Sequence, residues 1–103
     1  MVIGLLTLDL HFPGARSLKD KRQALRSLIA RARSRFNVSI AEVEHQDLWQ
    51  RSRVAVVAVN TDQAHLESSL DRIVREAAGP TVEVTGVERE FFGPEEGYLD
   101  EAE

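Results

Sequence analysis

Residues 2–36 read VIGLLTLDLHFPGARSLKDKRQALRSLIARARSRF, and within this stretch the apolar period changes from that of a strand to that of a helix. From Val2 to Phe12, apolar side chains alternate as in a strand with one buried face. Pro13-Gly14 ends the predicted strand. The face expected to be buried carries Val2, Gly4, Leu6, Leu8, Leu10 and Phe12. The opposite face carries Ile3, Leu5, Thr7, Asp9 and His11.

A helix is predicted to follow, from Leu18 to about Phe36. Ser17, with Asp20 three residues later, is a helix-start signature in which the serine hydroxyl accepts a hydrogen bond from a free backbone amide. The apolar stripe of this helix is expected to consist of Leu18, Leu25, Leu28, Ile29, Ala32 and Phe36.

The rest of the chain contains three further strands and a second helix. The strands are predicted over residues 37–46, 53–59 and 81–92. The helix is predicted to start near Asp62 and to end before Gly79-Pro80. Its buried stripe is expected to consist of Leu66, Leu70, Ile73, Val74 and Ala77.

The order β-α-β-β-α-β predicts an α+β fold of the ferredoxin-like type. We expect a four-stranded antiparallel sheet in the order 4-1-3-2, with both helices on one face. Residues 1–92 are predicted to form this single domain, and residues 93–103 an acidic tail without fixed structure. The tail could fold onto Arg31, Arg33 and Arg35 and compete with an anionic ligand, although we favour a solvated tail.

The composition excludes several classes of site. The chain of 103 residues is 43% hydrophobic and has no cysteine, which rules out disulfides, thiol catalysis and cysteine-ligated zinc. No apolar stretch approaches the ~20 residues that span a bilayer, and the N-terminus has no secretory-signal pattern. We therefore expect a cytoplasmic protein without a membrane partner. Most of its basic residues are arginine, which is typical of a GC-rich or thermophilic source.

Positive charge is concentrated in one predicted helix of a chain whose net charge is −4. Residues 16–35 contain eight of the thirteen basic residues and a single acid, Asp20. The free amides and the positive dipole end of a helix start add to these cations and favour an anion. We expect a phosphate group or an RNA backbone to bind Arg16, Lys19, Lys21, Arg22, Arg26 and Arg33.

The basic residues of this helix also allow a second interpretation. The cations could form an ordinary solvated surface, neutralised at the helix start by Asp20 and by strand acids such as Glu42 or Glu44. Lys21 falls inside the apolar sector of the helix, so we expect its stem to pack while its ammonium group reaches solvent.

A second cluster is predicted at the turn between the second and third strands. His45, Trp49, Arg51 and Arg53 are expected to gather there, beside the start of the first helix. A tryptophan flanked by arginines could stack on a nucleotide base. We favour the alternative, in which Trp49 and Leu48 pack over the open end of the core while the arginines face outward.

No metal, cofactor or catalytic site is predicted. The candidate ligands and acid–base groups lack metal-ligand spacing and fall on different strands or opposite faces; they are Asp9, His11, Glu42, Glu44 and His45. An acylphosphatase-like pair of Arg16 and Asn37 is excluded within one subunit, because these residues are expected at opposite ends of a helix about 30 Å long.

Two segments resemble the YlxP-like family of small bacterial proteins, a family of unassigned function. They read FPGARSLKDKR at residues 12–22 and NVSIAEVEHQDLWQ at residues 37–50, and the MVIGLL start is also similar. The resemblance covers nearly the whole chain apart from the acidic tail, and it implies a ferredoxin-like fold. It also implies a gene neighbourhood shared with translation-initiation and ribosome-maturation factors, and it supplies no catalytic residues.

These observations favour a non-enzymatic module that associates with RNA or a ribosomal particle through residues 16–35. Base stacking on the sheet, as in RNA-recognition motifs, is excluded for two reasons. The third strand carries no aromatic residue, and the first strand carries none before Phe12. The alternative is a homo-oligomeric module that binds a small molecule or a protein at the open sheet face, where Ile3 and Leu5 leave apolar surface. Hydrolysis of a phosphate ester or an acyl phosphate is the less favoured third possibility.

Overall fold

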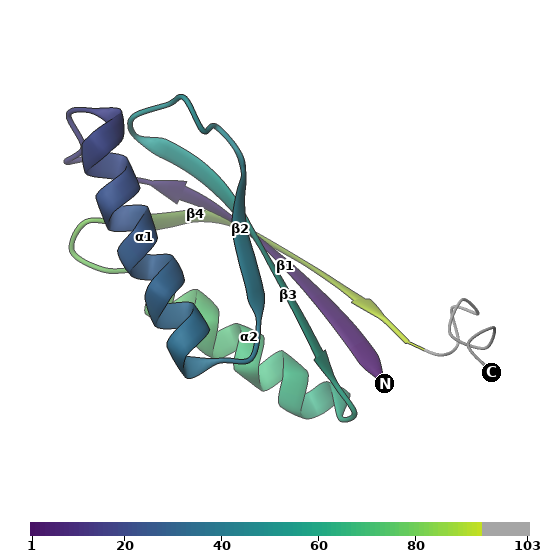
Figure 1. Cartoon of the computed structure of the whole chain (residues 1–103). Coiled ribbons are helices and arrows are strands. Elements are labelled where there is room, and N and C mark those ends of the chain that lie inside the picture. Colours follow the sequence, from purple (N-terminus) through teal and green to yellow (C-terminus); the bar gives the residue numbers. More distant parts are fainter. Residues whose placement is uncertain (94–103) are drawn as a thin grey trace.

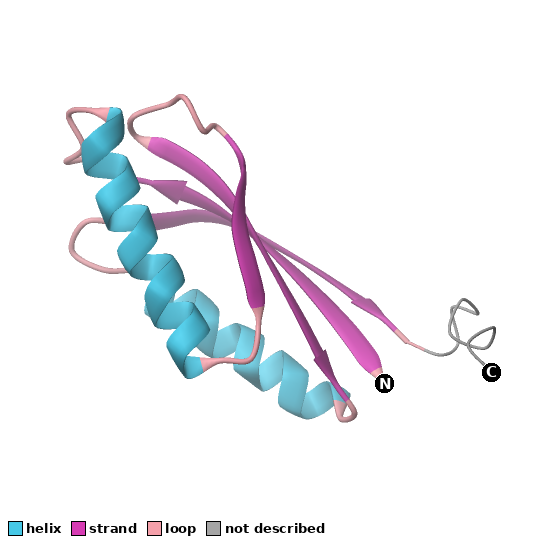
Figure 2. Ribbon diagram, in the orientation of Figure 1, coloured by secondary structure: helices cyan, strands magenta, loops and turns pink. Residues whose placement is uncertain are grey.

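The computed structural model describes residues 1–93, which form a four-stranded antiparallel sheet and two helices (Figure 1). In chain order the elements are β1 (Val2–His11), α1 (Leu18–Arg35), β2 (Ser39–Glu44), β3 (Arg51–Asn60), α2 (Gln63–Ala77) and β4 (Glu83–Phe92). The strand order β2-β3-β1-β4 confirms the predicted ferredoxin-like topology. Both helices lie on one side of the sheet and leave its other side open (Figure 2). Apart from Gly93, the predicted acidic tail lies outside the described residues.

The core lies between the sheet and the two helices. The predicted alternation of β1 is confirmed, because Leu6, Leu8 and Leu10 are at most 1% exposed. At Gly4, a Cβ atom would lie 3.1 Å from side-chain atoms of both Leu66 and Leu70 in α2. The missing side chain at Gly4 therefore lets α2 pack closely against β1. The apolar residues that α1 buries in the same core are Leu25, Leu28 and Ala32.

β2 is shorter than predicted, and β3 is longer. β2 begins at Ser39 opposite Val57, and the register of the pair shifts between Glu42 and Glu44, where β2 ends. β3 already pairs with β1 at Arg51, two residues earlier than predicted. The six residues of β2 therefore cover only part of the edge of β3, and the other strands extend beyond β2 in Figure 1.

The helix starts match the capping pattern in the sequence. The Oγ of Ser17 accepts a hydrogen bond from the amide of Asp20 at 3.1 Å, and the Asp20 carboxylate accepts one from the amide of Arg16 at 2.9 Å. Asp62 caps α2 by accepting hydrogen bonds from two amides of its first turn. Neither helix in the described part of the chain is long and apolar enough to cross a membrane.

Candidate nucleic-acid interface

Four basic side chains at the start of α1 are exposed to solvent; they belong to Arg16, Lys19, Arg22 and Arg26. Within residues 1–93, none of them forms an ion pair with a carboxylate. We call these four residues the α1 basic surface. Their charges add to the positive end of the α1 dipole, so positive potential gathers at this end of the helix.

Several basic residues elsewhere in the protein are matched by acids. Arg35 at the end of α1 lies 2.5 Å from Glu76 of α2, which Arg72 also approaches at 3.9 Å. Arg89 of β4 pairs with Asp71 of α2. The α1 basic surface differs from these arginines because no carboxylate within residues 1–93 pairs with its charges.

The α1 basic surface follows the flank of α1 that faces the β2 edge of the sheet. The direction of this flank is given by Arg33, whose Nη2 donates a hydrogen bond to the backbone oxygen of Ile40 in β2 at 3.1 Å. At about 100° per residue, Lys19, Arg22 and Arg26 lie within about 60° of Arg33 around the helix axis. Arg33 is exposed and uses one of its donors in this contact, so it extends the flank toward the end of α1.

Lys21 is completely buried, so the prediction that its ammonium group reaches solvent is wrong. Its Nζ atom lies 3.0 Å from Oε2 of Glu42 in β2. The same Nζ donates to the backbone oxygens of His45 at 2.8 Å, Arg51 at 3.2 Å and Gln46 at 3.4 Å. Because every donor of the ammonium group has an acceptor, the charge is stabilised inside the protein. Lys21 therefore stabilises the fold and does not belong to the anion-binding surface.

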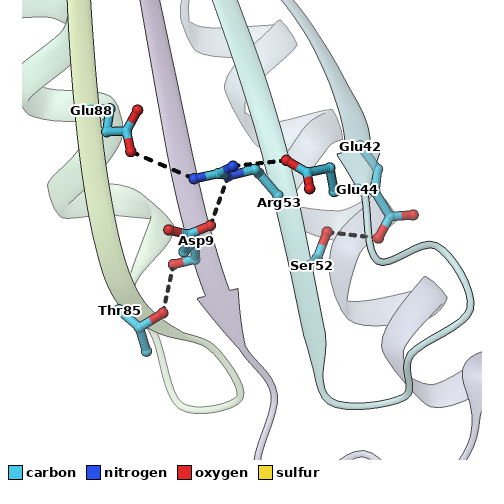
Figure 3. Close-up of polar contacts among 7 residues, drawn as sticks. All are labelled: Asp9, Glu42, Glu44, Ser52, Arg53, Thr85 and Glu88. Carbon is cyan, nitrogen blue, oxygen red and sulfur yellow. Dashed lines mark hydrogen bonds and ion pairs between the residues drawn. The ribbon is translucent and has the colours of Figure 1, made fainter.

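The register of β2 places Glu42, the partner of Lys21, on the helix side of the sheet. Ile40 and Glu42 pair with the buried residues Val56 and Val54 of β3, so both side chains point to the helix side of the sheet. Glu42 also accepts a hydrogen bond from Oγ of the buried Ser52 at 2.7 Å (Figure 3). This pair could have been predicted from the sequence. Glu42 has the same strand phase as Ile40, so its side chain is expected on the buried face, where a charge requires a partner.

The hairpin of residues 45–50 is bonded to the loop that precedes α1. The amide of Phe12 donates to the backbone oxygen of Gln50 at 2.8 Å. In return, Nε2 of Gln50 donates to the backbone oxygens of Pro13 at 3.3 Å and Ala15 at 3.0 Å. Together with the hydrogen bonds from the buried lysine, these contacts hold the hairpin at the start of α1.

Trp49 and Leu48 are exposed, and the prediction that they pack over the open end of the core is wrong. Their exposed fractions are 55% and 42%. At this end of the core, Phe12 and Ala15 are buried instead, with 1% and 8% exposed. The indole of Trp49 is therefore accessible to a ligand. At the base of the hairpin, His45 contributes its backbone oxygen and adopts a left-handed φ of 67°.

Arg53 is not the free cation that the sequence predicted at the hairpin. Its Nε lies 2.9 Å from Asp9 of β1 and its Nη1 lies 2.7 Å from Glu44 of β2, while Nη2 lies 3.6 Å from Glu88 of β4 (Figure 3). The hydrogen bond from Arg53 is the main cause that lowers the pKa of Glu44, and the same bond raises the pKa of Arg53. Of the two predicted arginines, Arg51 alone remains exposed without a carboxylate partner in the described part of the chain.

The remaining acid–base candidates are also engaged with the protein. Nδ1 of His11 lies 2.8 Å from Oε1 of Glu83 in β4. Asp9 and Glu44 share one arginine on the open face, whereas Glu42 lies on the helix side. Among residues 1–93, no three histidine, aspartate or glutamate side chains lie close enough together to hold a metal ion.

The open face of the sheet has a charged half and an apolar half. The charged half surrounds Arg53, and in the apolar half Val57 and Val59 of β3 are 42% and 52% exposed. These valines pair with Leu5 and Ile3 of β1, which are half-buried. A pocket of about 360 Å³ adjoins this apolar half.

The arginines at the end of α1 are partly engaged. Arg31 donates from Nη1 to Oγ of Ser27 at 2.9 Å, and Arg35 pairs with Glu76. The predicted contact of these arginines with the acidic tail involves residues outside the described part of the chain.

Comparisons with known proteins give a family without an assigned function. The family model described as "Protein of unknown function (DUF503)" matches residues 3–89. The uncharacterized protein YlxP of Bacillus subtilis (strain 168) is 34% identical over 92 residues, which cover 88% of this chain and all of the relative.

Two solved structures are similar to this chain at a lower sequence identity than YlxP. One is a putative chlorite dismutase, with a TM-score of 0.49 and 14% identity over 97% of this chain, which spans about half (48%) of that protein. Another is a dimeric ferredoxin-like protein from an uncultured marine organism, with a TM-score of 0.38 and 14% identity over 88% of this chain and 86% of the other. The match to the family model and the identity to YlxP confirm the resemblance seen in the sequence, and the chain belongs to the DUF503 family, the YlxP-like proteins.

Proposed function

We propose that this protein is a non-enzymatic cytoplasmic module that binds RNA, either free or within a ribosomal particle, through the α1 basic surface. The observation that supports the proposal is the exposure of all four cations without a carboxylate partner in residues 1–93. Two other cations of the same segment, Lys21 and Arg35, do have such partners. A row of exposed cations contacts phosphates rather than base edges, so binding is expected to be salt-dependent and largely independent of sequence.

The position of the cations on α1 also supports an anionic ligand. Lys19 lies in the first turn of α1, where a cation interacts unfavourably with the helix dipole by about 0.3–1 kcal/mol at low salt. Asp20 is the only acid in the first turn, and its carboxylate already accepts a hydrogen bond from the Arg16 amide. A phosphate bound at this helix end offsets the unfavourable interaction between the cation and the helix dipole, because helix N-termini attract anions.

The test is co-sedimentation with ribosomes and with purified RNA at low and moderate salt. The informative variant is Arg22→Glu/Arg26→Glu, and the matched control is Arg31→Glu/Arg75→Glu, which changes the net charge equally at exposed positions away from the α1 basic surface. We expect wild type and control to pellet and the first variant to remain in the supernatant. Equal pelleting of both variants would show that the α1 basic surface is not the site.

A second candidate function is self-association or ligand binding at the apolar half of the open sheet face. The observation that favours it is the exposure of Val57 and Val59 beside a pocket of about 360 Å³. Sedimentation equilibrium of Val57→Glu/Val59→Glu tests it, with Val87→Glu as a control at an equally exposed valine of the edge strand β4. A wild-type dimer that only the first variant dissociates supports this candidate, whereas a monomeric wild type removes self-association from it.

A further inference from the structure

Trp49 has the largest exposed fraction, 55%, among the exposed large apolar side chains of residues 1–93. Covering an exposed indole with a ligand lowers the free energy, because apolar surface is then removed from solvent. Its flat ring is suited to stacking on another flat ring, including any nucleotide base. The exposure of Trp49 therefore indicates a ligand surface that the α1 basic surface alone does not explain.

The hairpin that carries Trp49 is held in place by its hydrogen bonds. The next residue, Gln50, donates from its side chain to the backbone oxygen of Ala15 at 3.0 Å, and its own backbone oxygen binds the amide of Phe12. Within the hairpin, the amide of Leu48 donates to the backbone oxygen of His45 at 3.1 Å. A ring on such a fixed segment loses less conformational entropy when it binds a ligand than a ring on a mobile loop.

Two cations neighbour, along the chain, residues that the hydrogen bonds of the hairpin bring to the start of α1. Arg51 follows Gln50, and Arg16 follows Ala15, to which the Gln50 side chain is bonded. Both arginines are exposed and have no carboxylate partner in residues 1–93. The hairpin contains one acid, Asp47, which is also exposed. An aromatic platform next to cations is the arrangement that binds single-stranded nucleic acids.

We infer that this site takes single-stranded RNA, with the indole of Trp49 stacked on an unpaired base while Arg16 and Arg51 contact the adjoining phosphates. The inference rests on the proposed function, and it narrows the partner from RNA in general to unpaired RNA. In a duplex the base faces are covered by their neighbours, so a stacking side chain reaches only splayed or single-stranded bases. A protein partner fits this surface less well, because protein interfaces, although also enriched in Trp and Arg, centre on several apolar side chains. Here, Leu48 is the only other large apolar residue of the hairpin.

The chain contains a single tryptophan, so its intrinsic fluorescence reports on Trp49 alone. The experiment titrates the full-length protein with an oligouridylate of about twelve nucleotides and with a duplex of equal phosphate number. Fluorescence quenching detects stacking, and the anisotropy of labelled RNA gives the affinity. We expect the single strand to quench the fluorescence and to bind more tightly than the duplex.

Variants of the hairpin separate stacking from charge. Trp49→Ala is expected to weaken single-strand binding about 5- to 150-fold, the equivalent of one stacked base, whereas Trp49→Phe retains most of the affinity. Leu48→Ala, a change at the neighbouring exposed apolar residue, is the matched control and leaves the affinity near wild type. Because the side chain of Trp49 is exposed, circular dichroism should show the same fold in all variants.

The outcomes distinguish this inference from the proposed function. Equal affinities of Trp49→Ala and wild type, together with unchanged fluorescence, would overturn the stacking of Trp49. If Arg22→Glu/Arg26→Glu still weakens binding in that case, the proposed function stands. If the wild type binds neither RNA, the stacking inference is overturned, and co-sedimentation with ribosomes then decides the proposed function.

Discussion

The Nζ atom of Lys21 and the Oε2 atom of Glu42 lie 3.0 Å apart beneath the start of α1, and the lysine side chain is fully buried. The same ammonium group binds the backbone oxygens of His45, the first residue of the hairpin, and of Arg51, which follows the hairpin in β3. One buried charge therefore joins α1, β2 and the hairpin. The position of the hairpin at the start of α1 depends on this junction.

Lys21→Met should strongly destabilise the protein. The substitution keeps an apolar stem but leaves the charge of Glu42 unpaired, with only the hydrogen bond from Ser52, and removes the shared donor of several backbone oxygens. Removing one partner of a buried ion pair typically costs about 3–5 kcal/mol of unfolding free energy. Urea denaturation followed by circular dichroism measures this change.

Lys19→Met is the matched control for that substitution, because Lys19 is exposed two residues earlier in the same helix. Its effect on the unfolding free energy should stay within about 1 kcal/mol and be stabilising, because a cation is removed from the first turn. A similar small effect for Lys21→Met would contradict the structural role of the buried pair.

Lys19→Glu should have opposite effects on stability and on RNA binding. Removing the cation from the first turn and adding an acid there should each raise the unfolding free energy by about 0.3–1 kcal/mol at low salt. RNA affinity should fall, because a cation of the α1 basic surface is lost. Thermal unfolding and RNA binding of the same preparation test both parts, and a variant that is both less stable and unchanged in affinity would refute them.

The pH dependence of stability should show the ion pair between Arg53 and Glu44. Arg53 lowers the pKa of Glu44 below 4.5 in the folded protein, so the folded state releases this proton at a lower pH than the unfolded chain. The contribution of Glu44 is then fully present above the unfolded pKa and is lost as the pH falls through the folded pKa. Glu44→Gln should therefore have a lower Tm than wild type above about pH 5, and the difference should shrink on acidification.

An Arg53→Gln background provides the control for this titration. Without the guanidinium, Glu44→Gln should change the Tm by nearly the same small amount at every pH. If Glu44→Gln changes the Tm with the same pH dependence in this background as in wild type, Arg53 does not cause the lowered pKa of Glu44.

Gly86→Ala should disturb the charged half of the open face. A Cβ atom at Gly86 would lie 2.5 Å from Oδ2 of Asp9, which pairs with Arg53, so the Asp9 side chain must move. The expected loss of unfolding free energy is about 0.2–1 kcal/mol, because the displaced Asp9 carboxylate gives up a partly exposed ion pair. Gly14→Ala is the control, since nothing lies within 4 Å of a Cβ at that position. Equal stabilities of the two variants in urea would argue against the close contact at Asp9.

The fold could be predicted from the sequence because its signals are local and agree with one another. The alternation in β1, the Ser17–Asp20 cap and the apolar stripe of α2 each specify one element, and the element order leaves few topologies. The length of β2 could not be predicted in this way. It is set by the register shift between Glu42 and Glu44, which depends on the pairing with β3.

The candidate site could be predicted only in part, because the state of a charge depends on contacts distant in sequence. The exposed cations were recognisable from helical spacing, but the burial of Lys21 follows from acceptors more than twenty residues away. Arg53 was assigned to the hairpin on its sequence position, whereas cross-strand pairing places it among carboxylates from three other strands. Trp49 is exposed because Phe12 and Ala15 already occupy the end of the core, which no local pattern reveals.

The dependence of RNA affinity on salt tests the α1 basic surface most directly. For single-stranded RNA, four cations that each neutralise a phosphate should give a slope of log K against log salt of about −3. Wild type and Arg31→Glu/Arg75→Glu should share this slope, while Arg22→Glu/Arg26→Glu should show weaker binding and a slope reduced by about half. One common slope and affinity for all three proteins would contradict the assignment of RNA binding to this helix.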